Sequence, residues 1–477
     1  MVQTKASSVT FPQASAEDWR ALVAKTLGDR PLESLGAQTV EGLSIAPLYE
    51  AGPWPPAPTR PFDAERAWDL RVEVRHPDVT AANAQVLEAL EGGAASVRLI
   101  IDPAGEAGVA VGSAEALATL LSGVILEAAP VALEAGFLGV AAADWLSAAA
   151  KASPGARLNV HLDPISAFAQ MGASPGPIEA HLFAAAGAAA RLAQAYPHAE
   201  LFLASGRIAH EAGAGESLEI AFALASALAY AKAMVRAGMT MDEAFGRITL
   251  GLSADADYFM TIAKLRAARK AWARLTGACG LDVPARIEVR ASHRMLTRRD
   301  PWTNMLRLTS AGFGAAVGGA DAIILGAFTD ALGHPAELAR RQGRNIQLVL
   351  MEEAHVGRVA DPAAGSGYVE AMTDQMARGA WSAFQVIEGM GGLITALSAG
   401  HVAAEIESAN ATRAAEGAPK IVGVTAFPPA RDEPVELDSV TPAAVPAPSA
   451  RLPGPDGRCP PLPPIRTAEP FETEAAQ

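Results

Sequence analysis

Two pairs of polar residues follow apolar runs of the chain and are candidates for acid–base chemistry. His210 and Glu211 come shortly after the run that begins at Leu201, and His161 and Asp163 end another such run. An imidazole at the end of a strand can hold or move a proton beside a reacting group. A structural role is the more economical interpretation of Asp163, which stands where a side chain caps the next turn. The pairs therefore mark candidate positions rather than a reaction.

Metal, redox and nucleotide chemistry find little support in the sequence. The two cysteines, Cys279 and Cys459, are far apart, and their spacing makes no zinc site. So few cysteines indicate a reducing compartment. The glycines of GSGYVE from Gly365 do not lead from a strand into a helix with the spacing of a phosphate loop. We expect this chain to bind no metal.

Eight short apolar runs alternate with longer helical segments, and this alternation decides where the polar residues lie. The strands are predicted to begin at Asp69, Ser96, Pro130, Arg157, Leu201, Arg247, Arg286 and Ala322. The helices between and after them are predicted at 80–92, 113–124, 138–152, 178–195, 216–238, 255–277, 303–317 and 335–355. Eight such units over about 290 residues favour a closed parallel barrel over an open doubly wound sheet. We predict a (β/α)8 TIM barrel with its site at the carboxyl ends of the strands.

Extensions are predicted on both sides of this barrel. Residues 1–66 form an arm that is too rich in proline to be a domain alone, and a floppy tail is the equal alternative. The barrel is predicted to span 67–360. A helical extension follows at 361–427, with a short strand over KIVGVTAF from Lys420. The Pro-rich tail at 428–477 is expected to be extended or disordered.

The composition limits the classes of partner. The 477 residues are 50% hydrophobic and carry a formal net charge of -14, which suits a buried sheet under helices and argues against a general nucleic-acid binder. A coenzyme A site would need a local basic cluster. The first residues lack the apolar core of a signal peptide, and we expect no segment to cross a bilayer. A cytoplasmic protein with no nucleic-acid or membrane partner is predicted.

Several motifs occur in the order found in one enzyme family. Residues 204–214 read ASGRIAHEAGA, and the second half carries RRDPWTNMLR from Arg298 and EEAHVGRVADP from Glu352. Together with TVEGLSIAPLY from Thr39, they resemble methylmalonyl-CoA mutase over most of the chain, from roughly residue 38 to residue 472. The segment LDPISAFAQMG from Leu162 is more like the family's small subunit than its catalytic large subunit.

The resemblance implies that the family's catalytic residues are replaced. Ile208 stands where the motif SGYHxxEAGA carries the histidine that works beside the corrin and the thioester carbonyl. Glu73 stands at the tyrosine of RQYAG, where a carboxylate would repel an anionic substrate. Arg247 matches the arginine of the family's APRLS segment and is the best candidate for a substrate contact; a pairing with a neighbouring acid is the structural alternative. No catalytic residue is expected in this chain.

The resemblance also implies a cofactor and a partner. The ending from Arg451 resembles the linker that leads into the family's cobalamin domain, whose DxHxxG loop has no counterpart here. The nearest match is EEAHVG around His355, which more plausibly caps a helix. Adenosylcobalamin is therefore expected on a large catalytic subunit and not on this chain. That subunit would form a heterodimer with this chain, be wrapped by the arm and bind the acyl-CoA substrate.

Three functions are compatible with these patterns. The preferred one is the small, noncatalytic subunit of a methylmalonyl-CoA mutase, an isomerase that interconverts (R)-methylmalonyl-CoA and succinyl-CoA by a radical rearrangement on the large subunit. The alternatives are the catalytic barrel of a split acyl-CoA mutase with a separate cobalamin-binding subunit, and a non-enzymatic acyl-CoA-binding scaffold. A split enzyme would still need the polar contacts missing at Ile208 and Glu73. The first hypothesis also predicts a filled barrel lumen.

Overall fold

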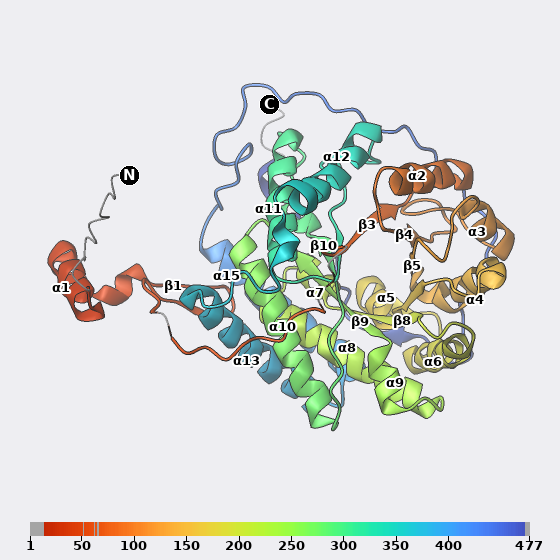
Figure 1. Cartoon of the computed structure of the whole chain (residues 1–477), viewed down its shortest axis with the longest axis horizontal. Coiled ribbons are helices and arrows are strands. Elements are labelled where there is room, and N and C mark those ends of the chain that lie inside the picture. Colours follow the sequence, from red (N-terminus) through yellow and green to blue (C-terminus); the bar gives the residue numbers. More distant parts are fainter. Residues whose placement is uncertain (1–13, 51, 62, 64–65, 473–477) are drawn as a thin grey trace, which may run out of the picture.

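The computed structural model describes residues 14–50, 52–61, 63 and 66–472, and its centre is a closed barrel of eight parallel strands (Figure 1). Each strand pairs with the next one along the chain, and the last pairs with the first to close the ring. The prediction of a (β/α)8 TIM barrel is confirmed. The strands are β3 (Asp69–Val74), β4 (Ser96–Ile100), β5 (Val131–Glu134), β6 (Leu158–Leu162), β8 (Glu200–Ser205), β9 (Ile248–Ala254), β10 (Ile287–Ala291) and β11 (Ala322–Ile324).

Eight helices on the predicted segments form the outer layer. Their buried faces are rich in alanine and leucine, which lets the helices pack closely on the strands. They are α2 (Val79–Glu91), α3 (Ala114–Leu120), α4 (Gly139–Ala149), α6 (Ile178–Ala195), α8 (Glu216–Arg236), α10 (Tyr258–Ala278), α11 (Asn304–Val317) and α12 (Glu337–Leu348).

One helix among the described residues, α8, is long and apolar enough to cross a membrane, contrary to our expectation that no segment would be. In the structure 72% of its apolar window is buried inside the molecule. A helix that is apolar all round and enclosed by protein is typical of a core.

Three shorter helices within the barrel were not predicted, and two of them directly follow strands. They are α5 (Pro164–Met171) after β6, α7 (Arg207–Glu211) after β8, and α9 (Met241–Gly246) before β9. The capping role predicted for Asp163 is confirmed, because its carboxylate accepts the backbone N–H of Ser166 at the start of α5. Of the three, α5 and α7 lie at the carboxyl end of the barrel and carry or adjoin candidate residues there.

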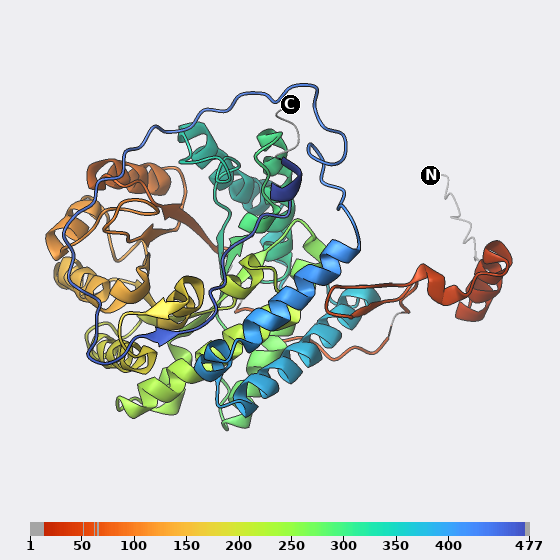
Figure 2. The ribbon, with the colours of Figure 1, turned by 180° about the vertical axis from the view of Figure 1, so that it is seen from behind.

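The helices after the barrel lie against its outer layer. They are α13 (Gly367–Gly389), α14 (Leu393–Ser398) and α15 (His401–Ala415), and α13 packs on both α8 and α10 (Figure 2). The strand expected after Lys420 is absent from the described chain. Residues 421–426 instead form a tight turn in which Val424, Thr425 and Ala426 donate to the carbonyl of Ile421.

Residues 428–472, here called the C-terminal strap, run as an extended chain around the barrel (Figure 2). Val445 donates its N–H to the carbonyl of Pro103, and the two-residue strand β12 (Gly457–Arg458) pairs with β7 (Ala173–Ser174). The strap ends in α16 (Glu469–Glu472). Residues 428–472 are thus extended in the structure, and the disorder predicted for 428–477 stays a prediction.

The amino-terminal arm projects away from the barrel (Figures 1 and 2). It contains α1 (Ala16–Leu27) and a small hairpin of β1 (Ala37–Gln38) and β2 (Ser44–Ile45). No residue of α1 is buried. Closer to the barrel, the carboxylate of Glu41 accepts the backbone N–H groups of Ser217 and Leu218 and so ties the arm to the start of α8.

Candidate functional site

The structure separates the three residues that the sequence singled out. Glu73 lies near the carboxyl end of β3, and Ile208 lies in α7 at that same end of the barrel. Arg247 stands just before β9, at the amino end, where it donates to the carbonyl of Ala199 at 3.0 Å. Arg247 therefore does not meet the other two. A role for it in substrate contact stays a prediction, limited to a ligand that approaches from the amino end.

Glu73 is engaged by arginine. Its Oε1 atom lies 2.9 Å from Nη2 of Arg290, while its Oε2 atom has no partner among the described residues. Burial opposes ionisation of Glu73, but Arg290 and Arg98 outweigh it, so the pKa of this carboxyl is lowered. Where the family places a tyrosine, this chain carries a fixed buried anion.

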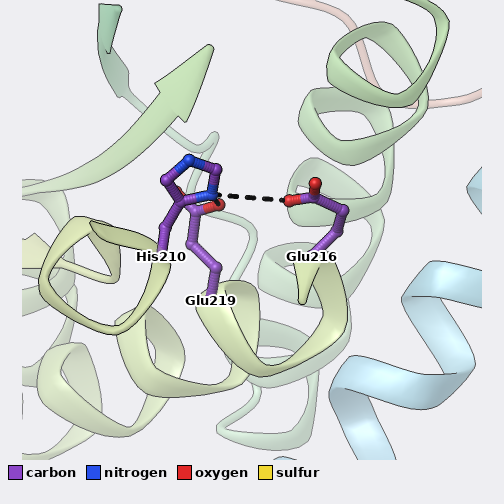
Figure 3. Close-up of side chains that lie close together, drawn as sticks. All are labelled: His210, Glu216 and Glu219. Carbon is purple, nitrogen blue, oxygen red and sulfur yellow. Dashed lines mark ion pairs between the residues drawn. The ribbon is translucent and has the colours of Figure 1, made fainter. Parts of the chain in front are cut away.

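His210 belongs to a buried ionic cluster between α7 and α8 (Figure 3). Its Nδ1 atom lies 3.2 Å from Glu219 and 3.8 Å from Glu216, and its Nε2 atom lies 2.8 Å from the hydroxyl of Ser292. Burial opposes protonation of His210, but Glu219 helps to outweigh it, and the pKa of the imidazole is raised. The ring is thus surrounded by carboxylates and a hydroxyl of the chain itself, which gives it a structural environment.

The same cluster has the donor set of a metal site, but an ammonium already lies there. The ligand atoms of His210, Glu216 and Glu219 lie within 4.8 Å of one another. Nζ of Lys264 lies 2.9 Å from Glu216 and 2.7 Å from Glu219. Burial disfavours the ammonium, but the two carboxylates outweigh it and raise the pKa of Lys264. The cation that these acids require is therefore supplied by the chain itself.

The second candidate pair, His161 and Asp163, is divided between the lumen and the outer layer. His161 lies 3.6 Å from Glu200 and 3.8 Å from Glu288. Asp163 instead accepts a hydrogen bond of 2.5 Å from the hydroxyl of Tyr230 on α8. Burial raises the pKa of Asp163 to about 6. The two side chains do not act as a pair.

A chain of ion pairs crosses the barrel lumen. Arg71 lies 2.5 Å from Glu288, Glu288 lies 2.9 Å from Arg98, and Arg98 contacts Glu134. Arg71, Arg98 and Glu288 are at most 3% exposed. Burial opposes ionisation of Glu288, but the arginines and His161 outweigh it and hold the pKa of its carboxyl well below its usual range. Charged side chains, which sequence inspection overlooked in favour of valine, leucine and isoleucine, thus occupy the interior.

Two cavities lie at opposite ends of this ion-pair chain. The one at the amino end has a volume of about 840 Å³ and is lined by Arg71 and several further basic groups. The one at the carboxyl end has a volume of about 170 Å³ and is lined by Glu134, Ile208 and Arg290. Because Arg71 lines the first cavity and Glu134 lines the second, the chain of ion pairs runs from one cavity to the other.

The C-terminal strap covers the carboxyl end of the barrel. Ile465 donates its N–H to the carbonyl of Glu211, and Thr467 donates to that of Arg294. Leu462 is buried against the core and lines the smaller cavity together with Pro464. Sequence reasoning missed this contact because a Pro-rich segment carries no periodicity from which a packed face could be predicted.

The remaining candidates lie outside this region. Cys459 is buried in the strap with its thiol 3.5 Å from the carbonyl of Phe168, and burial raises its pKa to about 11. Cys279 is partly buried at the end of α10. His355 is exposed and has a positive φ of 54°, at the end of a helical segment. None of the three offers a nucleophile or ligand to the barrel mouth.

Comparison with known proteins gives one consistent family. A family model described as methylmalonyl-CoA mutase matches residues 62–451. A methylmalonyl-CoA mutase small subunit from Streptomyces virginiae is 36% identical, and the match covers 97% of this chain and 76% of that protein. A probable methylmalonyl-CoA mutase small subunit from Mycobacterium bovis is 38% identical, and the match covers 84% of this chain and 68% of that protein. The small subunit from Propionibacterium freudenreichii subsp. shermanii is 36% identical, and the match covers 88% of this chain and 69% of that protein. The chain therefore belongs to the methylmalonyl-CoA mutase family.

Proposed function

We propose that this chain is the small, noncatalytic subunit of a heterodimeric methylmalonyl-CoA mutase. In that assembly the large subunit interconverts (R)-methylmalonyl-CoA and succinyl-CoA with adenosylcobalamin, and this chain is a cytoplasmic partner that is inactive alone. Relatives named as small subunits support the assignment. The observation that carries it is Ile208, a partly buried apolar side chain where the family motif has its histidine. An isoleucine can neither donate a hydrogen bond nor move a proton.

The rest of the barrel mouth supports the same proposal. Glu73 is paired with Arg290, and the ion pairs around Glu288 run between the two cavities. The lumen that an active barrel uses for pantetheine would have to be cleared of these buried charges. Breaking such pairs costs several kcal/mol each. A productive substrate path through this barrel is therefore disfavoured.

The residues at the carboxyl end do not fit a corrin. The strap lies across this end through Ile465 and Thr467, and Leu462 is buried under it. His355, in the nearest match to a cobalt-ligating motif, is exposed on a surface turn. We therefore assign adenosylcobalamin to the partner subunit and derive no step of the rearrangement from this chain.

The arm is the proposed contact with the large subunit. Leu22, Leu35 and Leu48 are all more than 40% exposed on it, although leucine is among the residues most often buried. A partner that covers these side chains and binds only the folded chain would stabilise it by mass action. Stable subunit interfaces bury on the order of 1,600 Å² or more, and a projecting arm can supply much of that area.

Co-expression with the large mutase subunit of the same organism tests the proposal. We expect a one-to-one complex on size exclusion, with corrin absorbance that depends on the large subunit alone. The double variant Ile208→His with Glu73→Tyr restores the family residues and should leave turnover of the complex unchanged. A gain in turnover from that variant, or a chain that binds a separate cobalamin-binding protein in place of the large subunit, would instead favour the split mutase.

The cavity at the amino end supports a second candidate, an acyl-CoA-binding scaffold. Arg60, Arg157 and Arg286 line its 840 Å³ and offer the basic groups that phosphate requires, beside four carboxylates of the same lining, one of which, Glu200, pairs with Arg286. Calorimetric titration with coenzyme A tests this candidate. Saturable binding that is weakened by Arg286→Gln would support it, and heats no larger than those of dilution would exclude it.

A further inference from the structure

Arg207 is a buried cation without a bonded partner. Its side chain lies in α7 next to Ile208, and the residue is 7% exposed. Across the described part of the chain, no acceptor lies within hydrogen-bond distance of its Nε atom and no acid forms an ion pair with it. A buried charge is costly unless it is paired and hydrogen-bonded. Arg207 is therefore a candidate binding group.

The cavity of about 170 Å³ at the carboxyl end lies beside this arginine. The other charged groups of its lining are already engaged. Arg290 pairs with Glu73 at 2.9 Å, Glu211 accepts the backbone N–H groups of His293 and Arg294, and Glu134 contacts Arg98. The guanidinium of Arg207 and the ring of His293 are left as donors on the wall.

The acids nearest to Arg207 do not replace a bonded partner. Burial and the neighbouring Arg290 act against its charge and lower its pKa, whereas Glu288, Glu73 and Glu211 stabilise the charge through space. Glu73 holds one oxygen on Arg290 and lies outside the cavity lining. An anion inside the cavity would meet two arginines at once.

We propose that this cavity binds a small oxyanion, held by the guanidinium of Arg207 with support from Arg290 and His293. Arginine presents donors in a planar fork that matches carboxylate and phosphate oxygens. A cavity of this volume admits an ion of a few heavy atoms but not an extended pantetheine. Leu462 and Pro464 of the strap form part of its wall, and these apolar side chains lower the local dielectric and so strengthen the contacts of a bound ion with the arginines.

Thermal unfolding of the full chain tests the site, with inorganic phosphate and acetate titrated separately against sodium chloride of equal ionic strength. We expect Tm to rise by a few degrees and to saturate with at least one oxyanion, because a ligand of the folded state stabilises it by mass action. A rise with phosphate alone identifies a tetrahedral oxyanion, and a rise with acetate identifies a carboxylate. No saturable rise with either ion overturns the proposal.

Matched variants locate the effect. Arg207→Met should abolish the saturable rise, whereas Arg286→Met, which removes a cation from the cavity at the amino end, should retain it. The opposite result overturns the proposal. If Arg207→Met does not fold, Ile208→Phe replaces it as the test, because the larger side chain fills the cavity and keeps the arginine. Loss of the saturable rise in Tm in Ile208→Phe supports the site, and an unchanged rise refutes it.

Discussion

Replacing Lys264 by methionine tests the buried cluster at the start of α8. The substitution keeps the length of the side chain and removes an ammonium that lies 2.9 Å from Glu216 and 2.7 Å from Glu219. Lys264 is 1% exposed and Glu219 is 0% exposed, so water cannot replace the lost contacts. The variant leaves two carboxylates beside a single imidazole, that of His210.

The expected loss follows from this geometry. Removing one partner of a buried ion pair costs about 3–5 kcal/mol, because the other charge stays buried without compensation. A domain is stable by only about 5–15 kcal/mol, so a large part of the stability would disappear. At about 2.1 cal/mol/K of unfolding entropy per residue, the Tm of a chain of this length should fall by about 3–5 °C.

Urea unfolding of matched variants measures this loss. Lys232→Met is the control, because Nζ of Lys232 lies 2.9 Å from Glu388 but the lysine side chain is 53% exposed. Exposed pairs contribute about 0–1 kcal/mol. Adding Glu219→Gln to Lys264→Met should recover part of the loss, since one uncompensated charge is then gone. A Lys264→Met loss no larger than that of the control would refute the reasoning.

Three further predictions address the same structure. Lys264→Ala removes the ammonium beside His210, Glu216 and Glu219, whose ligand atoms lie within 4.8 Å of one another. Zn²⁺ should then bind to these three residues and raise the Tm of the variant, whereas it should not raise the Tm of the native chain. Burial opposes ionisation of Glu200, but His161 at 3.6 Å, Arg286 and Arg71 together bring its pKa from 4.5 down to about 2. Its contribution to stability is therefore present above pH 4.5 and is lost as pH falls from 4.5 toward 2. Urea midpoints should therefore drop over that range and drop less in Glu200→Gln; parallel profiles would count against the pairing. Leu462→Asp should release the end of the strap and speed tryptic cleavage there. Ala444→Asp, at an exposed position of the strap, is the control and should not change the rate of cleavage. Equal rates in the two variants would argue that Leu462 does not anchor the strap.

The barrel was predictable because its strands are short apolar runs that alternate with helices long enough to show a period. Helix α7 was not, since Arg207–Glu211 is too short for periodicity. Asp163 followed by Pro164 did carry a signal, because an acid before proline is a common helix start. The path of the strap depends on backbone hydrogen bonds to distant loops, which no local pattern encodes.

The candidate site was only partly predictable for the same reason. The strand and the motif located Glu73 and Ile208 at one end of the barrel. The partner of Glu73, Arg290, is 217 residues away, and pairings over such a distance depend on the closed fold. Arg207 stands directly before Ile208, at the tyrosine of the motif SGYHxxEAGA, and a charged residue at that position was the signal that could have found it.

The path of the strap has a consequence for the order of folding during synthesis. Gly176 donates its N–H to Asp456, which lies 280 residues later, so this contact forms only after all eight barrel strands have left the ribosome. Contacts between residues so far apart in the sequence form late, because closing the long loop between them costs conformational entropy. The carboxyl end of the barrel is thus open while the barrel assembles and is covered afterwards. An ion retained beneath Leu462 would be enclosed at that last step, and its exchange would then be governed by local opening of the strap rather than by unfolding of the barrel.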